Sequence, residues 1–444
     1  MKIIRKNVTS FLKTDNKELL SLLRKKYSAK IPGASYSKAY KHGWDGTKYF
    51  ITEKGQIGTG LLPFIEQDLI SAELDYSIQD ERDPLIDSPS IEVEGIEYRG
   101  YQETLIRKAL EAGMGLIEAP TGAGKTIVLA GLLKALEGKH GLVFFTQKSL
   151  LEQTYKFLTK YGFDVGRVYG DGTDIKPITL CTVQSIHKVL DSHLDTSEFI
   201  IFDEVHEFAK GKITTKVIKA FPNANYRFGM SATMPRDRMG KLNLTAYLGS
   251  IISDVDVQGL VEDGFLTPPT VTFVNLPEYT DHSLLDSTYV DIYDSHIINN
   301  TVRNGKIKKI CSNVKEGKIL ILVKNLKHLE LLRELLPEAL TLEGKDDLLT
   351  REATIEKFKR DKHSILIGTK ILQTGIDIPE ITHMINARGL KSEIATLQAL
   401  GRALRIHESK TQVNIYDFND TVPYLKEHSN ARRRAYKSLK IKVL

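Results

Sequence analysis

The segment from Ala119 to Thr126, Ala-Pro-Thr-Gly-Ala-Gly-Lys-Thr, has the residue types and spacing of a phosphate-binding loop. Its two glycines permit the tight turn in which backbone N–H groups surround phosphate oxygens. Lys125 would pair with the outer phosphates of ATP, and the Thr126 hydroxyl would bind Mg²⁺. The alternative is a simple glycine turn between strand and helix. We predict nucleotide contacts along the whole loop: Thr121, Gly122, Ala123, Gly124, Lys125 and Thr126.

Asp203 and Glu204 follow an apolar run, Phe199 to Phe202, which we expect to be a buried strand. Such a strand would deliver both carboxylates to the carboxyl end of a parallel sheet, where ligands bind. We assign Asp203 to Mg²⁺, and Glu204 to orienting and deprotonating the attacking water. An acidic pair after a strand commonly lies in a solvated loop, so the combination with the phosphate loop carries this assignment.

His206 lies two residues after Glu204, and the segment Ser231-Ala-Thr233 follows the next apolar run. We predict that His206 couples the nucleotide site to Ser231 and Thr233. The alternative is a surface histidine without such a role.

A third candidate segment, Gln398 to Arg405, reads Gln-Ala-Leu-Gly-Arg-Ala-Leu-Arg. On a helix, Gln398, Arg402 and Arg405 would share one face, because they are spaced by four and three residues. Two guanidinium groups on that face could stabilise the charge that develops on a transferring phosphoryl group. The alternative for this segment alone is a solvated or ion-paired surface.

Two regions of alternating short β-rich runs and amphipathic stretches would position these residues, and they indicate an α/β fold with two parallel sheets. We interpret Asp263 to Asn300, between them, as a connection plus a helix. A helix is also expected over Lys327–Leu336. The expected strands are Gly115–Ala119, Gly141–Thr146, Ile178–Thr182, Phe199–Phe202 and Tyr226–Met230 in the first region, and Lys318–Val323, Ser364–Ile367, Met384–Asn386 and Val413–Asp417 in the second.

The N-terminal 90 residues fit neither region and predict a small α+β domain with a helix around Asn16 to Tyr27. Residues 1–60 carry 13 basic and 4 acidic side chains, whereas residues 61–95 carry one basic and ten acidic ones. This change of sign is consistent with a domain boundary. The basic C-terminal stretch, which includes Arg432, Arg433 and Arg434, is interpreted as a solvated helix rather than a phosphate-binding one.

The ordered motifs from residue 98 to residue 405 resemble those of superfamily 2 helicases, in the branch with Asp-Glu-x-His. The resemblance implies two RecA-like motor domains, ATP hydrolysis and paired arginine fingers at Arg402 and Arg405. It implies that Gln102 reads adenine, and that Gly375 and Asp377 lie near the ribose. It also implies nucleic-acid contacts by Thr146, Gln147, Lys148, Thr182, Gln184, Ser185, Lys324 and Thr369, although several of these could be ordinary polar residues that cap helices.

His206 and Gln398 depart from the motifs of the RNA-remodelling branch, and this departure favours DNA as the nucleic acid. The basic N-terminal region, with Gly43-Trp-Asp-Gly46, resembles the accessory domain of phage branch-migration helicases. That resemblance implies unwinding of forked or branched DNA, with contacts from Lys41, Trp44 and Lys48. For Trp44 we favour the alternative that it is a core residue. An RNA helicase and a duplex-DNA translocase subunit of a larger complex remain alternative functions.

The expected domains are an accessory domain at 1–90, a first motor domain at 91–265, and a linker with the second motor domain and basic tail at 266–444. The formal net charge of +6 is compatible with a polyanionic partner. Two distant cysteines and the absence of a long apolar run favour a cytoplasmic protein, in the host cytoplasm if phage-encoded, without membrane contact. We expect a monomer with no obligatory protein partner.

Overall fold

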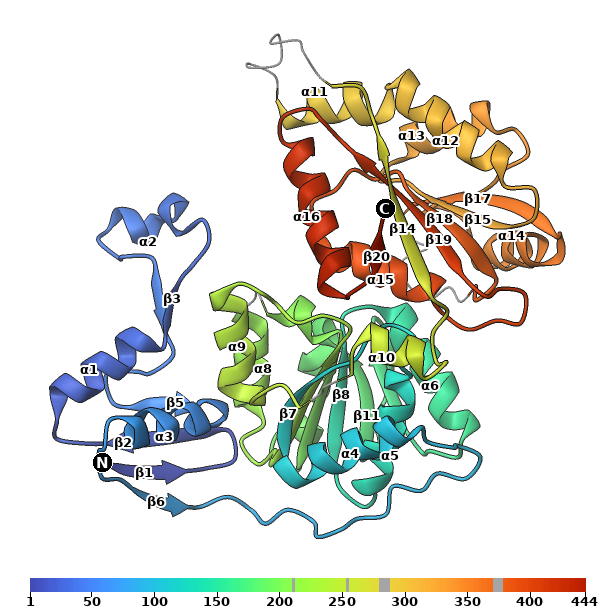
Figure 1. Ribbon diagram of the computed structural model, residues 1–444. Helices are drawn as coiled ribbons and strands as arrows, with labels where there is room; N and C mark the ends of the chain where they lie inside the picture. The colour runs from blue at the N-terminus through green and yellow to red at the C-terminus, as the bar shows by residue number, and fades with distance from the viewer. Residues whose placement is uncertain (210–211, 253–254, 279–287, 370–377) are drawn as a thin grey trace. The chain divides into compact units, whose positions relative to one another are not determined.

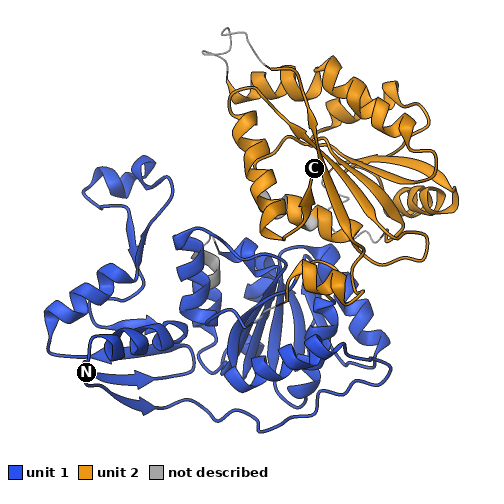
Figure 2. Ribbon diagram, in the orientation of Figure 1, with its two compact units in different colours: residues 1–119, 124–254 blue, residues 120–123, 255–444 orange. Residues whose placement is uncertain are grey.

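The computed structural model describes residues 1–209, 212–252, 255–278, 288–369 and 378–444 (Figure 1). It divides into two compact units (Figure 2). The first comprises Met1–Ala119 and Gly124–Asp254, and the second comprises Pro120–Ala123 and Val255–Leu444. Each unit contains one large parallel sheet, so the predicted α/β fold class is confirmed.

The first sheet has seven strands in the order β10-β9-β11-β8-β12-β13-β7, and all neighbours except β10 and β9 are parallel. Leu142 and Phe144 pack into one apolar core, and Val143 and Phe145 pack into another. Both faces are therefore covered, which explains the continuous apolar runs. The strands are β7 (Met114–Glu118), β8 (Gly141–Phe145), β9 (Gly166–Tyr169), β10 (Gly172–Asp174), β11 (Ile178–Thr182), β12 (Phe199–Asp203) and β13 (Tyr226–Ser231).

Helices and 3₁₀ turns connect these strands (Figure 1). Their bounds are α4 (Gly100–Ala112), α5 (Lys125–Ala135), α6 (Lys148–Lys160), η3 (Val183–Lys188), α7 (Leu190–His193), η4 (Val205–Phe208), α8 (Lys212–Ala220) and α9 (Arg238–Leu248). The expected strands of this region match the observed ones to within one residue at each end.

The second sheet is parallel throughout, in the order β16-β17-β15-β18-β19-β14-β20. Its strands are β14 (Pro269–Asn275), β15 (Gly317–Leu322), β16 (Leu340–Leu342), β17 (His363–Gly368), β18 (Ile381–Asn386), β19 (Val413–Asn419) and β20 (Lys442–Val443). The helices are α10 (Val257–Glu262), α11 (Tyr289–Tyr293), the π helix η6 (Asp294–Ile298), α12 (Thr301–Asn313), α13 (Leu326–Leu335), α14 (Leu348–Arg360), α15 (Glu393–Ala403) and α16 (Leu425–Ser438).

Strand β14 corrects the interpretation of Asp263 to Asn300 as a connection plus a helix. It pairs with β19 along its whole length and also with β20, so it is an internal strand of the second sheet. Pro268 and Pro269 indicated a linker, but a proline at the first residue of a strand removes no necessary hydrogen bond. The strand was missed for this reason.

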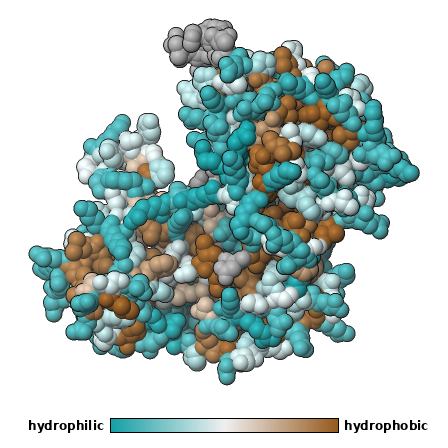
Figure 3. Space-filling view, in the orientation of Figure 1, coloured by the Kyte–Doolittle hydropathy of each residue, from teal (hydrophilic) through white to brown (hydrophobic). Residues whose placement is uncertain are grey.

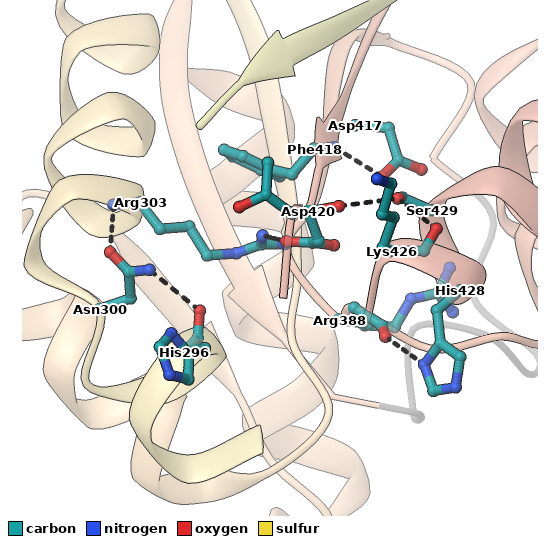
Figure 4. Close-up of polar contacts among 12 residues, drawn as sticks. His296, Asn300, Arg303, Arg388, Asp417, Phe418, Asp420, Lys426, His428 and Ser429 are labelled. Atoms are coloured by element: carbon teal, nitrogen blue, oxygen red, sulfur yellow. Dashed lines mark hydrogen bonds and ion pairs between the residues drawn. The ribbon is translucent and has the colours of Figure 1, made fainter. Parts of the chain in front are cut away.

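Arg432 corrects the prediction that the basic C-terminal stretch is solvated. Its side chain is fully buried and bonds Asp417 and Asp420, with Nε 3.0 Å from Asp417 Oδ1. Arg303 of α12 also forms an ion pair with Asp420 (Figure 4). These four residues, called here the charged core of the second unit, join α12, α16 and β19. A basic run can therefore contain one residue whose partners are distant in sequence.

The N-terminal region contains a four-stranded sheet in the order β5-β2-β1-β6 and a β3-β4 hairpin. Its elements are β1 (Lys2–Arg5), β2 (Thr9–Lys13), α1 (Lys17–Lys26), β3 (Ser28–Lys30), η1 (Ala34–Tyr36), α2 (Lys38–Lys41), β4 (Thr47–Tyr49), β5 (Gln56–Gly58), η2 (Thr59–Leu61), α3 (Leu62–Ser71) and β6 (Ser77–Asp80). Figure 3 shows brown apolar patches on the visible face of this region. Leu22, Phe64 and Ile70 are exposed apolar side chains of the region.

This region packs closely against helix α9, which lies beside the first parallel sheet. Ile3, Leu12 and Ile57 belong to the same apolar core cluster as Phe144 and Phe202. A Cβ at Gly58 would lie 2.0 Å from the Ala246 carbonyl oxygen on α9, so the contact leaves no room for a side chain. The predicted boundary near residue 90 stays a prediction, while the N-terminal region lies in one compact unit with the first sheet.

No helix in the described part of the chain has the length and apolarity that crossing a membrane requires.

Candidate functional site

The phosphate loop connects β7 to α5, as expected. Gly122 and Gly124 have φ angles of 93° and 77°, which L side chains rarely adopt. Gly124 directly precedes the first turn of α5, so the loop backbone leads into a helix N-terminus. Lys125 is half-buried and donates a hydrogen bond from Nζ to the Ala119 carbonyl oxygen at 3.2 Å. Its ammonium group is thus held against the loop it is predicted to serve.

Gln102 lies directly behind this loop, on α4. Its side chain is fully buried, and its Oε1 accepts a hydrogen bond of 3.0 Å from the Arg99 backbone N–H. A Cβ at Gly124 would lie 2.4 Å from Gln102 Nε2, so the amide and the loop are in close contact. This placement supports the predicted role of Gln102 in adenine recognition, which stays a prediction.

Asp203 is the last residue of β12, and Glu204 follows it with a left-handed φ of 48°. That strained conformation directs the two carboxylates differently from an extended strand, and strain of this kind concentrates at functional sites. Burial and the neighbouring Glu204 charge raise the pKa of Asp203 to about 7. Burial also tends to raise the pKa of Glu204, but Lys125 and the His206 hydrogen bond together lower it to about 2.

His206 and Ser231 are brought together, as the sequence predicted. His206 Nδ1 lies 2.7 Å from Ser231 Oγ and 3.3 Å from Glu204 Oε2. Ser231 Oγ in turn donates to the Thr233 carbonyl oxygen at 2.8 Å. A polar chain therefore leads from the carboxylate assigned to the water to the segment after β13. Whether it transmits the nucleotide state stays a prediction.

Glu118 is a residue that the sequence reasoning missed. It ends β7, immediately before the phosphate loop, and its Oε1 accepts a hydrogen bond of 3.0 Å from the Met234 backbone N–H. It thereby ties the loop to the segment that contains Ser231 and Thr233. No spacing in the sequence indicates this bond, because Glu118 and Met234 are 116 residues apart in the chain, although β7 and β13 are adjacent in the sheet.

The predicted nucleic-acid contacts near the first parallel sheet lie at the carboxyl ends of two adjacent strands. Thr146, Gln147 and Lys148 follow β8, and Thr182, Gln184 and Ser185 end or follow the adjacent strand β11. The Thr182 hydroxyl lies 3.0 Å from Ser185 Oγ and makes no side-chain cap to η3. Thr182 is the residue that precedes η3 at the end of β11, so the alternative that it is an ordinary strand-end polar residue stays open, although its side chain makes no cap hydrogen bond. Backbone binding by this group stays a prediction.

Lys324 and Thr369 occupy the corresponding edge of the second sheet, after the adjacent strands β15 and β17. Lys324 is exposed, and its Nζ lies 4.3 Å from the ring centroid of Tyr293. Gly375 and Asp377 lie outside the described residues.

Arg402 lies on α15, but the helix ends at Ala403, so Arg405 is beyond it. The prediction that Gln398, Arg402 and Arg405 share a helix face is therefore wrong for Arg405. The chain turns at this point, where the Thr267 backbone N–H donates to the Leu404 carbonyl oxygen at 2.8 Å. Gln398 is on α15, and its side chain is outside the described part. Roles of the two arginines in hydrolysis stay predictions.

Two protein families match this chain. The family of the type III restriction enzyme res subunit matches residues 95–236, and the helicase conserved C-terminal domain matches residues 303–407. The first match contains the phosphate loop and both carboxylates, and the second contains both arginines.

The chain belongs to the superfamily 2 helicases.

Similar proteins include the ATP-dependent DNA helicase uvsW of Enterobacteria phage T4, 26% identical over 365 residues, or 76% of this chain and 72% of the relative. Putative helicase 22 of a Sulfolobus islandicus filamentous virus is 25% identical, with 74% of this chain and 65% of the relative covered. The putative DNA 3'-5' helicase Rad25 of Haloarcula marismortui is 25% identical, with 75% and 54% covered. The chain thus covers 72% of the length of the uvsW helicase, but little more than half of the length of the Rad25 helicase.

Solved structures confirm the helicase fold. The crystal structure of T4 UvsW matches with a TM-score of 0.50 and 20% identity, covering 100% of this chain and 99% of that one. A DNA-bound type ISP restriction-modification enzyme, LlaBIII, matches with a TM-score of 0.58 and 17% identity, covering 78% and 30%. As a superfamily 2 helicase, the chain is an ATP-hydrolysing enzyme with a nucleotide-binding site.

The residues of this helicase fit a divalent cation beside the nucleotide. Mg²⁺ prefers oxygen ligands and keeps several waters, so the Thr126 hydroxyl and the Asp203 carboxylate suffice as protein ligands. Asp203 and Glu204 are adjacent, half-buried carboxylates, and a cation next to Asp203 would relieve their repulsion. Among the described residues, no cluster of three or more His, Cys, Asp or Glu forms a metal site.

The proposed accessory contacts of the helicase lie around Trp44. Its side chain is half-buried and is absent from the buried core, so the favoured interpretation of Trp44 as a core residue is wrong. Lys41 is exposed, and Lys48 Nζ donates to Asn243 Oδ1 on α9 at 2.5 Å. Tyr36 is 90% exposed, which also contradicts a core made of these aromatics.

Proposed function

We propose that this helicase hydrolyses ATP with Mg²⁺ and uses the cycle to translocate on DNA, unwinding or migrating forks and four-way junctions. The observation that carries the proposal is the placement of Lys125, Asp203 and Glu204 at the carboxyl ends of one parallel sheet. A nucleotide at a phosphate loop meets both carboxylates only in such an arrangement. The similarity to a phage ATP-dependent DNA helicase supports DNA as the nucleic acid.

Each side chain then has a defined task. Lys125 and the loop N–H groups hold the phosphates, while Thr126 and Asp203 hold the cation, which neutralises charge on the phosphate oxygens when bound. Lys125 and the His206 hydrogen bond lower the pKa of Glu204, so its carboxylate is ionised at neutral pH and can orient the attacking water by accepting a hydrogen bond from it. Arg402 and Arg405 supply positive charge to the transferring phosphoryl group.

Movement requires that hydrolysis alter the grip on the strand. We propose that His206 and Ser231 carry the change at Glu204 to the segment after β13, while Thr146, Gln184 and Thr369 hold the DNA backbone. Two grips that alternate during each cycle convert hydrolysis into steps. Gly375 and Asp377 are proposed near the ribose, and Gln398 beside the phosphates.

Two substitutions test the hydrolysis step. Lys125→Ala should abolish ATP hydrolysis, and Arg402→Ala should retain ATP binding while turnover falls roughly 10³-fold or more, as expected for an arginine finger. The matched control is Arg333→Ala, because Arg333 is an arginine of the second unit with a half-exposed, surface side chain. Normal turnover in Arg402→Ala would end the model.

A comparison of nucleic acids tests the substrate. Single-stranded, duplex, forked and four-way DNA and RNA of equal length should be compared for stimulation of ATP hydrolysis, and forked and four-way DNA should stimulate most. Stimulation by RNA alone would favour an RNA helicase. Translocation on duplex without strand separation would favour a translocase subunit, the alternative suggested by the restriction-enzyme family match. We also propose a monomer, which sedimentation with and without DNA would test.

A further inference from the structure

A cavity of about 990 Å³ lies between the β3-β4 hairpin region and helix α9 of the first unit. Its walls include Ile31, Trp44, Thr47 and Lys48 from the N-terminal region, and Met239 and Asn243 from α9. The volume is in the range of small-molecule and cofactor pockets. The family matches begin at residue 95, so the N-terminal wall lies outside the conserved helicase domains.

The walls of this cavity are fastened together. Lys48 Nζ bonds Asn243 Oδ1 at 2.5 Å, and Arg238 Nε donates to the Ser28 carbonyl oxygen at 2.9 Å. Trp44 Nε1 donates to the Thr47 carbonyl oxygen at 3.2 Å, which fixes the orientation of the indole ring. The Trp44 ring is therefore held in place without a ligand, so binding would cost little conformational entropy in this wall of the cavity.

The lysines around the cavity favour an anionic ligand, while Asp237, the acidic residue among those lining it, accepts a hydrogen bond from the Gly240 backbone N–H at 2.8 Å. Lys38 and Lys41 are exposed on the short helix α2, next to Ala39, which lines the cavity. Residues 1–60 carry 13 basic against 4 acidic side chains. A flat aromatic surface with lysines around it is the combination that binds single-stranded nucleic acid, through base stacking and phosphate pairing.

We propose that this cavity binds an unpaired nucleobase, stacked on Trp44, with the adjoining phosphates near Lys38 and Lys41. The inference rests on the proposed DNA-binding function and adds a site for one part of the substrate. A base in a duplex is covered by its neighbours and cannot present a face to the ring. The cavity would therefore recognise DNA in which an unpaired strand adjoins a duplex, as at a fork.

Recognition of the base should not depend on its identity. Asn243 Nδ2 already donates to the Ala209 carbonyl oxygen at 2.7 Å, and its Oδ1 accepts from Lys48. The Thr47 hydroxyl donates to Asp45 Oδ2 at 2.6 Å. Because these amide and hydroxyl groups are already paired, stacking rather than hydrogen bonding to the base edge would supply the binding energy.

Trp44 is the one tryptophan of the chain, so its fluorescence reports directly on the cavity. A single-stranded oligonucleotide should cause a saturable loss of Trp44 emission. An oligomer of the same length made of abasic deoxyribose phosphates should bind, as measured by anisotropy of an attached dye, without that loss. Equal quenching by both oligomers, or binding of the base-containing oligomer without quenching, would overturn the inference.

Two further variants separate stacking from folding defects. Ala39→Leu fills the cavity from an exposed position and should suppress the quenching while Trp44 remains, whereas Ser35→Leu adds the same side chain at an exposed position outside the cavity. Trp44→Ala should weaken binding to forked DNA roughly 10-fold or more and leave binding to blunt duplex unchanged. Unchanged fork binding in folded Trp44→Ala, judged by circular dichroism, would also overturn it.

The proposed function can fail separately. If no DNA binds or stimulates ATP hydrolysis in the unaltered protein, the DNA helicase proposal itself fails. If DNA does both and the fluorescence results are negative, only the base-binding cavity is rejected.

Discussion

The two units each contain a group of ionisable side chains beside the parallel sheet, but the two groups differ in exposure and in how their charges are balanced. In the first unit, Asp203 and Glu204 are adjacent acids with His206 and Lys125 as their nearest counter-charges. In the charged core of the second unit, two arginines and two aspartates pair directly, and all four side chains are at most 2% exposed.

The difference shows in the proton affinities. Burial and the adjacent Glu204 carboxylate raise the pKa of Asp203, so this carboxyl group binds a proton more readily than it would in water. Burial alone would lower the pKa of Arg432, but Asp417 and Asp420 raise it above its ordinary value. If Asp203 holds a cation, as proposed, the two adjacent acids would gain part of their compensation from that ligand, whereas the charged core of the second unit is neutralised by its own side chains.

The largest effect should follow from removing one charge of the compensated group. Arg432→Met leaves buried Asp417 without its cationic partner, while Asp420 keeps only Arg303, and should lower the free energy of unfolding by about 3–5 kcal/mol. Arg434→Met, an exposed position on the same helix, is the matched control. Urea unfolding followed by circular dichroism should show the loss, while Trp44 fluorescence, which reports on the first unit, should not shift. A parallel shift of both signals would contradict the separation of the two units.

His328 provides an acid-dependent test of the same unit. It is fully buried, and burial followed by the charge of Arg303 lowers its pKa to about 3, from 6.5 in the unfolded chain. Below pH 6.5 the unfolded state takes up a proton that the folded state refuses, so stability should fall by about 3 kcal/mol between pH 6.5 and pH 4. His328→Gln should flatten this dependence, and His187→Gln, at an exposed position, should not.

A smaller, specific effect is expected from the polar chain of the first unit. Ser231→Ala should leave ATP hydrolysis near normal but lower DNA strand separation per ATP on the order of 10-fold, since coupling energies are typically of that size. Ser192→Ala is a matched control, because Ser192 Oγ pairs with His193 Nδ1 at 2.9 Å away from the site. Equal losses in hydrolysis and unwinding would mean that Ser231 serves the chemistry rather than the coupling.

The smallest effect should come from an ion pair outside both groups. Arg107 and Glu103 pair on the surface of α4 at 2.9 Å, with about half of each side chain exposed. Glu103→Gln should change the unfolding free energy by no more than about 0.5 kcal/mol. A loss of unfolding free energy as large as that of Arg432→Met would show that burial does not determine how much an ion pair contributes to stability.

The sequence predicted the strands best where both faces of a sheet are covered. Strand β11 matches its predicted bounds, and β12 differs only by Asp203. The sequence-based prediction was wrong at β14, because its two prolines indicated a linker. It was also wrong in placing Arg405 on a helix, because α15 ends at Ala403. For β11 and β12, the local apolar pattern is enough to indicate a strand. For β14 the pairing with distant strands is decisive, and for Arg405 the decisive feature is the turn of the chain after α15.

By itself, the sequence determined the helicase class, the phosphate loop and the order of the α/β elements, because glycine conformation, residue chemistry and apolar periodicity are local properties. Only the tertiary structure decided that Arg432 is neutralised by Asp417 and Asp420, that Glu118 bonds the Met234 backbone, and that Trp44 faces a cavity against α9. These contacts join segments separated along the chain, and their energies depend on burial and distance, which no spacing of residues encodes.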